Sequence, residues 1–351
     1  MIVDKKYCLS SFLQLRTIYD HDVCFCEEFA PFFFEENLDR NLVFSNLDLE
    51  KQLRNCVSEA LSNGKCAICL SGGIDSAILA TFMPKGSIAY TFRCIVPGVD
   101  VVDETVQAAK YARECGLIHK VINVYWEDHL AFSRLLMSHK GAPIHSIEVQ
   151  IYKAALEAKK DGVDTLIFGE SADVNFGGQD GLLSRDWTPC EYMERFSFVM
   201  PHLVLKNPII INEPFFKYSD SGLMNAHEFN RHVYYCESMG SYLNATQTAG
   251  VKLCCPFSKT YMGSDLDLSR VRGGENKYLV RELFKRLYGD FPIPKKTPMP
   301  RPMNEWMSDW PGPSRPEFLD GIQLSKFSGD QKWMLYILEL FLNMIDEKVA
   351  R

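Results

Sequence analysis

The sequence lacks an excess of basic residues, since 38 lysines and arginines stand against 45 aspartates and glutamates and the formal net charge is −7. This balance argues against a protein that binds duplex nucleic acid or tRNA through a broad basic face. A membrane-spanning run is also lacking, because the longest apolar stretch, 333–345, is too short for a bilayer and contains Glu339. With 46% hydrophobic and 24% charged residues, the composition is that of a globular protein and excludes disordered and fibrous chains.

The marks of a secreted protein are missing as well. Residues 1–6 do not begin a signal peptide, and the twelve cysteines do not have the spacing of a disulfide framework. We therefore expect a cytoplasmic protein with reduced thiols. Two close pairs, Cys24 with Cys26 and Cys66 with Cys69, have no second pair or histidine at ligand spacing, which disfavours a zinc site.

The 351 residues contain no internal repeat, low-complexity tract or long linker, and they suit one large domain or two ordinary ones. From about residue 64, short apolar runs alternate with longer amphipathic ones. The expected strands are 66–70, 87–95, 120–124 and 165–168, and the expected helices are 75–83, 103–114 and 147–160. This alternation predicts an α/β fold with a doubly wound parallel sheet, in which ligands bind at the carboxyl ends of the strands.

The rest of the chain has a different pattern. A helix is expected at 47–61, and after about residue 187 the sequence is rich in aromatics with helical periods, ending in an amphipathic run at 331–349. Prolines at high density between Phe291 and Pro302 forbid helix and sheet interior, which predicts an ordered loop or strap over the surface.

One motif, Ser71–Ser76 with the sequence Ser-Gly-Gly-Ile-Asp-Ser, follows the first expected strand and begins a helix. Its glycines allow a tight turn that brings backbone N–H groups close to an anion, and its serines add hydroxyl donors. Asp75 would repel phosphate unless a cation lay between them, which points to Mg²⁺. A plain Gly-Gly turn would explain the glycines alone, whereas all six residues in this context predict a phosphate site.

This motif resembles the pyrophosphate-binding loop (PP-loop) of the N-type ATP pyrophosphatases, which cleave ATP to AMP and pyrophosphate. It lacks the Gly-Lys-Ser/Thr ending of a Walker loop, so kinase and GTPase chemistry is not implied. A second motif, Phe168–Gly178, resembles the Gly-Glu-Gly-Ser/Ala-Asp-Glu-Leu-Phe-Gly-Gly segment of the asparagine synthetase synthase domain. The sequence departs from that segment at Val174, where the family usually has glutamate, which leaves one carboxylate fewer for metal binding.

The resemblance implies ATP and Mg²⁺ as cofactors and assigns residues to each. The implied ATP site comprises Leu70, Ser71, Gly72, Gly73, Asp75, Ser76, Thr91, Phe92, Phe168 and Gly169. Asp75 and Asp173 would hold Mg²⁺, and Glu170 would lie near the reacting carbonyl as a base or an orienting group. His119 falls where the family often has a histidine, but a lone histidine is more often structural.

Farther along, Glu275–Glu282 looks like the family's Lys-x-x-Leu-Arg helix, and a basic pair follows it in the proline-dense segment. In the family, a lysine of this basic loop contacts the phosphates during adenylation. By this resemblance Lys296 is the catalytic candidate and Lys295 the second choice, with a solvated basic loop as the alternative.

The segment Gly250–Lys259 departs from the family pattern Gly-x-Glu-x-Arg-x-Pro-Phe-Leu-Asp. Its Lys252, Cys254 and Lys259 stand where the family has Glu, Arg and Asp. In the family this segment lines the acyl-substrate side of the site, so the exchange favours a substrate other than aspartate, and a more anionic one. A sugar acid is expected by analogy with stand-alone relatives among bacterial surface-polysaccharide gene sets.

The resemblance covers about 45–300 and leaves no room for the glutaminase domain of glutamine-using relatives. Residue 2 is Ile2, the first cysteine is Cys8, and 70 residues precede Ser71. We therefore expect the nitrogen to come from free ammonia, a separate glutaminase or an amine-bearing substrate. The expected division is an N-terminal segment 1–60 that packs on the synthase domain, an ATP-binding core 61–190, and a mostly helical part 191–351 that completes the synthase domain and its acyl-substrate site.

Together these features predict an ATP-dependent ligase that adenylates a small-molecule carboxylate, releases AMP and pyrophosphate, and transfers the acyl group to ammonia or an amine. Two alternatives stay open, and the oligomeric state stays open with them. One is a catalytically silent nucleotide-binding scaffold, which Val174 and the altered Gly250–Lys259 segment allow. The other is a PP-loop enzyme that thiolates tRNA with Cys66 and Cys69, which the acidic net charge disfavours.

Overall fold

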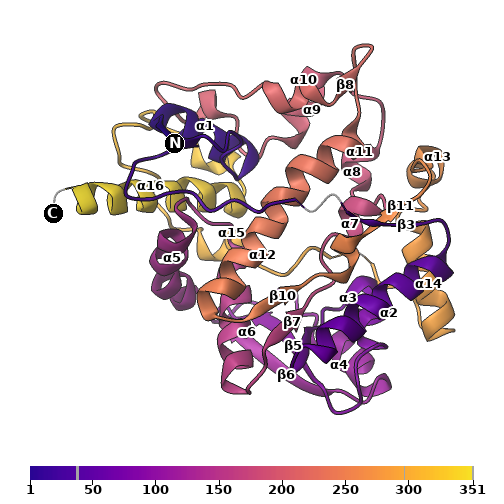
Figure 1. Ribbon diagram of the computed structural model, residues 1–351. Coiled ribbons are helices and arrows are strands. Elements are labelled where there is room, and N and C mark those ends of the chain that lie inside the picture. The colour runs from indigo at the N-terminus through magenta and orange to yellow at the C-terminus, as the bar shows by residue number, and fades with distance from the viewer. Residues whose placement is uncertain (37–38, 296, 350–351) are drawn as a thin grey trace.

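The computed structural model describes residues 1–36, 39–295 and 297–349. Its centre is a five-stranded sheet in the order β10-β7-β4-β5-β6, in which every neighbouring pair is parallel. The strands are β4 (Cys66–Cys69), β5 (Ile88–Cys94), β6 (Ile118–Val124), β7 (Thr165–Ile167) and β10 (Lys252–Cys254). Helices cover both faces of this sheet (Figure 1), which confirms the predicted doubly wound α/β fold.

The two faces of the sheet lie in two hydrophobic cores. One core contains Cys66 and Ile68 of β4 and the helices α2 (Asn46–Ser62), α3 (Ile74–Ala80), α4 (Thr105–Glu114) and α14 (Tyr278–Tyr288). The other core contains Ala67 and Cys69 of β4 and the helices α1 (Lys5–Leu15), α5 (Trp126–Lys140), α6 (Ile147–Lys160), α12 (Tyr235–Ala249) and α16 (Gly329–Val349). Because Cys66 and Cys69 point to opposite faces of one strand, they cannot work as a thiol pair, and this geometry argues against the tRNA-thiolating alternative.

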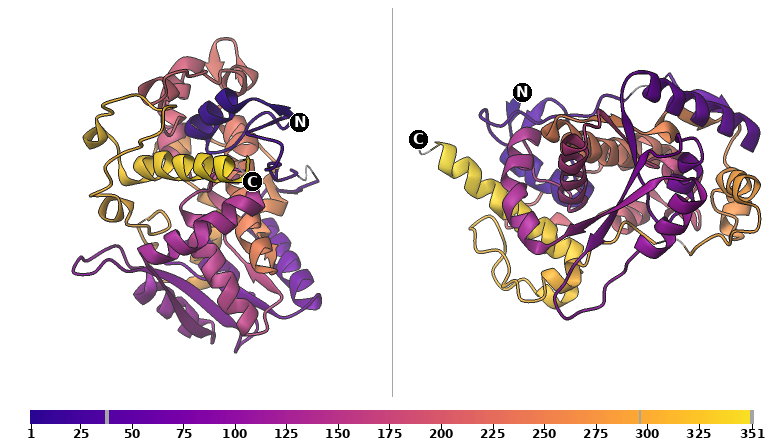
Figure 2. Two further views of the ribbon diagram at one scale, coloured as in Figure 1. Left: turned by 90° about the vertical axis from the view of Figure 1, so that its left-hand side faces the viewer. Right: turned by 90° about the horizontal axis from the view of Figure 1, so that it is seen from below.

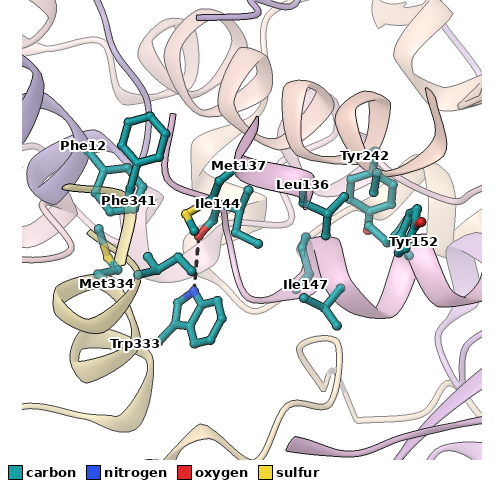
Figure 3. Close-up of a cluster of buried hydrophobic side chains, with 14 of the residues drawn as sticks. Phe12, Leu136, Met137, Ile144, Ile147, Tyr152, Tyr242, Trp333, Met334 and Phe341 are labelled. Atoms are coloured by element: carbon teal, nitrogen blue, oxygen red, sulfur yellow. Dashed lines mark hydrogen bonds between the residues drawn. The ribbon is translucent and has the colours of Figure 1, made fainter. Parts of the chain in front are cut away.

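Side chains from distant parts of the chain pack together in the core that contains Ala67 and Cys69, as Figure 3 shows. Phe12 of α1 and Phe341 of α16 lie beside Met137 of α5, and the indole Nε1 of Trp333 donates a 3.2 Å hydrogen bond to the carbonyl of Ile144. Helix α16 and the N-terminal segment lie on the same side of the molecule (Figure 2). Segments from both ends of the chain are therefore packed against the helices that cover the sheet.

The predicted strands and helices of the α/β core are all present, with ends shifted by a few residues. Helix α5 and strand β10 are among the elements that were not predicted. Helix α5 buries His129, Ser133 and Lys140 among its apolar residues, so its apolar period is weak. Strand β10 has only three residues and joins the sheet at its edge beside β7, so local pattern gives no signal for it.

Shorter elements surround this framework. In the N-terminal part, β1 (Ile2–Val3) pairs with β2 (Val23–Cys24), and β3 (Asn41–Val43) pairs with β11 (Thr260–Met262). The remaining elements are α7 (Ala172–Asn175), α8 (Asp180–Leu183), α9 (Pro189–Phe196), α10 (Glu213–Lys217), β8 (Ser219–Asp220), β9 (Leu223–Met224), α11 (Ala226–Phe229), a π-helical turn (Asn230–Tyr234), α13 (Leu268–Arg272), α15 (Met303–Trp306) and 3₁₀ turns at Pro201–Leu203, Pro256–Lys259 and Leu324–Lys326. Within the described part of the chain, every helix is too short or too polar to cross a bilayer.

The proline-dense segment 291–302, here called the strap, has no helix or strand in its described residues, as predicted. The carbonyl of Pro300 anchors it to the core, because it accepts hydrogen bonds from the thiol of Cys94 at 3.2 Å and from the amide of Gln150 at 3.0 Å. The strap therefore passes over the carboxyl end of β5 and the start of α6.

Candidate active site

The loop between β4 and α3 has a fixed shape. The backbone N–H of Ser71 donates to the Ser76 hydroxyl at 3.0 Å, the two serine hydroxyls are also 3.0 Å apart, and the Gly73 N–H donates to the Ser71 hydroxyl at 3.1 Å. The Gly72 N–H donates to the carboxylate of Glu104, at the start of α4. Burial raises the pKa of Glu104 to about 7, although the Gly72 hydrogen bond acts in the opposite direction. The loop amides can thus bind a carboxyl group, as an anion-binding turn does.

Gly169, just after β7, brings the second motif against this loop. A Cβ at residue 169 would lie 2.8 Å from the backbone nitrogen of Ser76 and 3.1 Å from the carbonyl carbon of Asp75. Both of these are backbone atoms, so they cannot move aside without displacing the start of α3. Close approach of the two motifs therefore requires glycine at this position.

We expect Gly169→Ala to lower the free energy of unfolding by about 1–3 kcal/mol, the usual loss when a packed site is overfilled. Urea unfolding followed by circular dichroism would measure it. The matched control is Gly240→Ala in α12, where an added Cβ would only touch the Cβ of Phe34 at 3.7 Å. There the gain in helix propensity should leave the stability unchanged or higher, and an equal loss in both variants would contradict the steric argument.

Two carboxylates and one ammonium meet beside the loop. The Nζ of Lys277 lies 2.9 and 2.7 Å from the two carboxylate oxygens of Asp75 and 2.8 Å from Oδ1 of Asp173. Lys277 is 7% exposed. Burial alone would lower the pKa of its ammonium, but Asp75 and Asp173 raise that pKa above its ordinary value. The lysine is therefore charged and holds the two carboxylates together.

The surrounding backbone is shaped for this contact. Lys277 has a left-handed conformation with φ 50°, an arrangement that non-glycine residues adopt at some cost. Gly178 also has no room for a side chain, because a Cβ there would lie 2.1 Å from Oδ1 of Asp173 and 2.7 Å from Cδ of Lys277. The second glycine of the Gly177-Gly178 pair is thus explained by the packing of the charged cluster.

Glu170 lies next to this cluster, in a half-buried position. Burial raises the pKa of its carboxyl, and the charge of Asp173 acts in the same direction. The backbone N–H of Ser171 and the hydroxyls of Ser238 and Tyr242 donate hydrogen bonds to it and oppose the shift. Ser171 is left-handed with φ 76°, a second strained residue at this site. Helix α12 therefore fixes the orientation of Glu170 through two hydroxyl groups.

A cavity of about 430 Å³, here called the strand-end cavity, opens over the carboxyl ends of the strands. Its lining includes ten of the predicted site residues: Leu70, Ser71, Asp75, Ser76, Thr91, Phe92, Phe168, Gly169, Glu170 and Asp173. The Thr91 hydroxyl donates to the carbonyl of Leu70 at 2.6 Å and lies 2.8 Å from Nε2 of His119. His119 is not a lining residue, and it acts on the site by holding the Thr91 hydroxyl in place. Gly72 and Gly73 belong to the loop that borders the cavity.

Of the two predicted strap lysines, only Lys295 is among the described residues, and it does not line this cavity. Lys295 is exposed, and Lys296 lies outside the described residues. The strap contributes Thr297, Pro298, Met299 and Arg301 to the lining instead. The buried lysine of the site is Lys277, which the Lys-x-x-Leu-Arg resemblance already contained but to which no role was assigned.

Other lining residues were missed by sequence reasoning because they come from distant segments. They are Arg16, Glu104, His145, Ile147, Tyr234, Ser238 and Tyr242, while Val174 and Gln179 of the lining lie in or directly after the second motif. The altered segment Gly250–Lys259 behaves differently from the expectation. Lys252, Cys254 and Lys259 line a separate cavity of about 440 Å³ beside β10 and α2, here called the edge cavity, and not the wall next to Glu170.

Much of the chain is similar to one known protein family. A family model described as asparagine synthase matches residues 48–247, more than half of the chain. Among curated proteins no match was found. Among solved structures, an NMN synthetase from Francisella tularensis is 13% identical over 73% of this chain and 99% of that chain, with a TM-score of 0.30.

Proposed function

Because this chain belongs to the asparagine synthase family, we propose that it is an ATP-dependent ligase that forms an amide from a carboxylate and ammonia or an amine. The observation that carries the proposal is the convergence of Asp75, Asp173 and Lys277 beside the Ser71–Ser76 loop, with Glu170 at the same strand ends. A cavity with a phosphate-type loop, an acidic pair and a second carboxyl group is suited to phosphate chemistry next to acyl chemistry.

In this proposal ATP lies in the strand-end cavity with its phosphates on the loop. The amides and hydroxyls of Ser71, Gly72 and Ser76 would bind the pyrophosphate part, and Glu104 would leave the Gly72 amide when phosphate arrives. The adenosine would lie against Leu70, Thr91 and Phe92 at the ends of β4 and β5. Met299 of the strap lines the same cavity and would help to cover the nucleotide.

The acidic pair fits a magnesium ion. Asp75 and Asp173 already converge on one cation, the ammonium of Lys277, and carboxylate oxygens are the ligands that Mg²⁺ prefers. Bound there, Mg²⁺ would offset the negative charge that develops on the phosphates of ATP. Lys277 would hold the two carboxylates in position and add a positive charge beside the departing pyrophosphate.

The carboxylate substrate would attack the α-phosphorus of ATP, giving an acyl-adenylate and pyrophosphate. The nitrogen of ammonia or an amine would then attack the acyl carbon, and AMP would leave. Glu170 would accept a proton from that nitrogen or orient it, and its raised pKa makes its carboxylate a stronger base than an ordinary one. Positioning and charge stabilisation would supply most of the rate enhancement.

The test is product analysis with Mg-ATP, ammonium and a pool of small carboxylic acids, including amino acids and uronic acids. We expect AMP and pyrophosphate to form only when an acid is present, and Asp75→Asn to lower their formation by about 10²- to 10³-fold. The matched control is Asp100→Asn, at an exposed position on the β5–α4 connection. ADP and orthophosphate as products would contradict the proposal, and ATP binding without turnover across the pool would favour the silent scaffold.

A further inference from the structure

Arg16, from the N-terminal part of the chain, also lines the strand-end cavity. Arg16 follows α1 and caps it in a left-handed conformation with φ 57°, a place where glycine is the usual residue. Its side chain is buried, with the residue 6% exposed, and it lines the cavity. Residue 16 is outside the segment 48–247 that matches the family model. A strained, buried arginine at a cavity wall needs an explanation in the chemistry of the cavity.

The hydrogen bonds of Arg16 fix its guanidinium in place. Nη2 donates to Glu237 of α12 at 3.0 Å, Nη1 lies 2.7 Å from Nε2 of His145, and the plane lies 3.7 Å from the ring centre of Phe198. Nε has no hydrogen-bond partner among the described residues. A buried arginine N–H left without a partner is costly, which favours a further acceptor at this wall.

His145 adds a second donor to the same wall. Since a guanidinium can only donate, Nε2 of His145 must be the acceptor in its contact with Arg16. The imidazole is then neutral, in agreement with its lowered pKa, which results from burial and from the positive charges of Arg16, Arg301 and Lys140. The remaining proton is on Nδ1, which lies 3.7 Å from Glu237 and has no hydrogen-bond partner in the described part of the chain.

Arg301 of the strap adds a second guanidinium to the lining of the cavity. Its Nε donates to Asp330 at 2.7 Å, and it lines the strand-end cavity together with Arg16 and His145. The carboxylates that pair with the two arginines, Glu237 and Asp330, are not among the described residues that line this cavity. The acidic lining residues, Asp75, Glu104, Glu170 and Asp173, come from the Ser71–Ser76 loop, the start of α4 and the second motif. The cavity is therefore lined by both cationic and acidic groups.

We propose that the acid adenylated by this protein carries a second anionic group, which Arg16 and Arg301 bind with the help of His145. The inference rests on the proposed function, since it places the reacting carboxylate near Glu170 and the loop, and the second anion at Arg16 and Arg301. Guanidinium groups bind carboxylate and phosphate oxygens in a forked geometry, so either group meets this chemistry. A neutral tail would offer no anionic acceptor to the donors that remain at this wall, among them Nε of Arg16.

A structural role for Arg16 makes different predictions. If Arg16 only tied α1 to α12 through Glu237, its replacement would lower stability and all activities together. If Arg16 binds the second anionic group of the substrate, its replacement changes which acid is used. The preference between matched acids therefore separates the two roles, and it can be measured first on the unmodified chain.

The experiment is ATP–pyrophosphate exchange with paired acids that differ in the second group: succinate against succinamate, glutarate against glutaramate, and 3-phosphoglycerate against glycerate. We expect one or more dianionic acids to support exchange, with kcat/KM about 100-fold above that of the neutral-tailed partner, the effect of one buried charge pair. Comparing the carboxylate and phosphate pairs identifies which anion is bound. Equal use of both members of every active pair, or preference for the neutral one, would overturn the inference.

Variants then test whether Arg16 and Arg301 cause the preference for dianionic acids. Arg16→Gln should raise KM for the dianionic acid about 100-fold, leave KM for its neutral partner within about 3-fold, and leave the Kd for Mg-ATP unchanged, while Arg16→Lys keeps part of the preference. Arg185→Gln, at an exposed site, is the control. Arg301→Gln tests the same wall from the strap if Arg16 variants do not fold. Weaker ATP binding in Arg16→Gln would overturn the inference, because Arg16 would then contact the nucleotide and not the acid.

Failure of the proposed function looks different. If no acid of either kind supports exchange while Mg-ATP binds, the ligase proposal fails and the substrate inference falls with it. If neutral-tailed acids alone support exchange, the ligase proposal stands and only the inference about the second anion is lost.

Discussion

Replacing Lys277 with methionine will lower ATP–pyrophosphate exchange by about 10²- to 10³-fold, the loss that follows removal of one group stabilising developing charge. Methionine keeps much of the length of the side chain but removes the ammonium that lies between Asp75 and Asp173. The two carboxylates then repel each other unless another cation binds between them. Exchange rates at saturating ATP and acid, measured over a range of Mg²⁺ concentrations, would show the effect.

The Mg²⁺ dependence separates a specific role of Lys277 from a general loss of structure. Without the competing ammonium, the acidic pair should bind a cation more tightly, so half-maximal exchange should need less Mg²⁺ although the maximum is lower. Lys295→Met, at an exposed position in the strap, is the matched control and should retain exchange. If Lys295→Met lost exchange and Lys277→Met retained it, the strap lysine would be the phosphate-contacting group.

Local sequence was enough to predict the part of the site that is built locally. Strand β4, the loop and α3 follow one another without a break, and their glycines, serines and Asp75 have the spacing that the turn needs. The second motif is local in the same way, because Glu170 and Asp173 directly follow β7. Parallel strands place these two segments side by side at one edge, so the pairing of the motifs could be predicted from the fold class.

The remaining residues come to the site through long-range packing, which no local pattern encodes. Arg16 reaches the cavity because α1 packs in the same core as α12 and α16, and Arg301 because Pro300 anchors the strap to β5 and α6. Lys277 is 202 residues from Asp75 in the sequence. Its motif was visible, but the basic pair in the nearby strap was chosen and Lys277 was given no role. Its contact with Asp75 and Asp173 is formed only by the three-dimensional fold.

The altered segment Gly250–Lys259 illustrates a further limit. Its substitutions were interpreted as a change in the acyl-substrate wall, yet strand β10 is at the edge of the sheet and places Lys252, Cys254 and Lys259 in the edge cavity. The expectation of a more anionic substrate now has a different basis. It depends on Arg16 and Arg301, which line the strand-end cavity. Neither arginine belongs to the family pattern.

Replacing Glu170 with glutamine will separate the two half-reactions. We expect amide formation to fall by about 10²- to 10⁴-fold, the range for loss of a general base, while ATP–pyrophosphate exchange changes little. Glutamine keeps the size of the side chain and can still accept hydrogen bonds from Ser238 and Tyr242, but it cannot accept a proton. Amide product and exchange, measured on the same preparation, give the ratio of the two steps.

The pH dependence of the unmodified chain should show the same separation. Burial and Asp173 raise the pKa of Glu170, so the carboxylate that can accept a proton is present only above that raised pKa. Amide formation should therefore rise with pH through this pKa, whereas exchange should not follow it. Glu104→Gln is the matched control, since Glu104 contacts the Gly72 amide and its loss should change ATP binding rather than the ratio of the two steps. A parallel loss of exchange and amide formation in Glu170→Gln would show instead that Glu170 acts in adenylation, by positioning the acid or the metal-binding pair beside it.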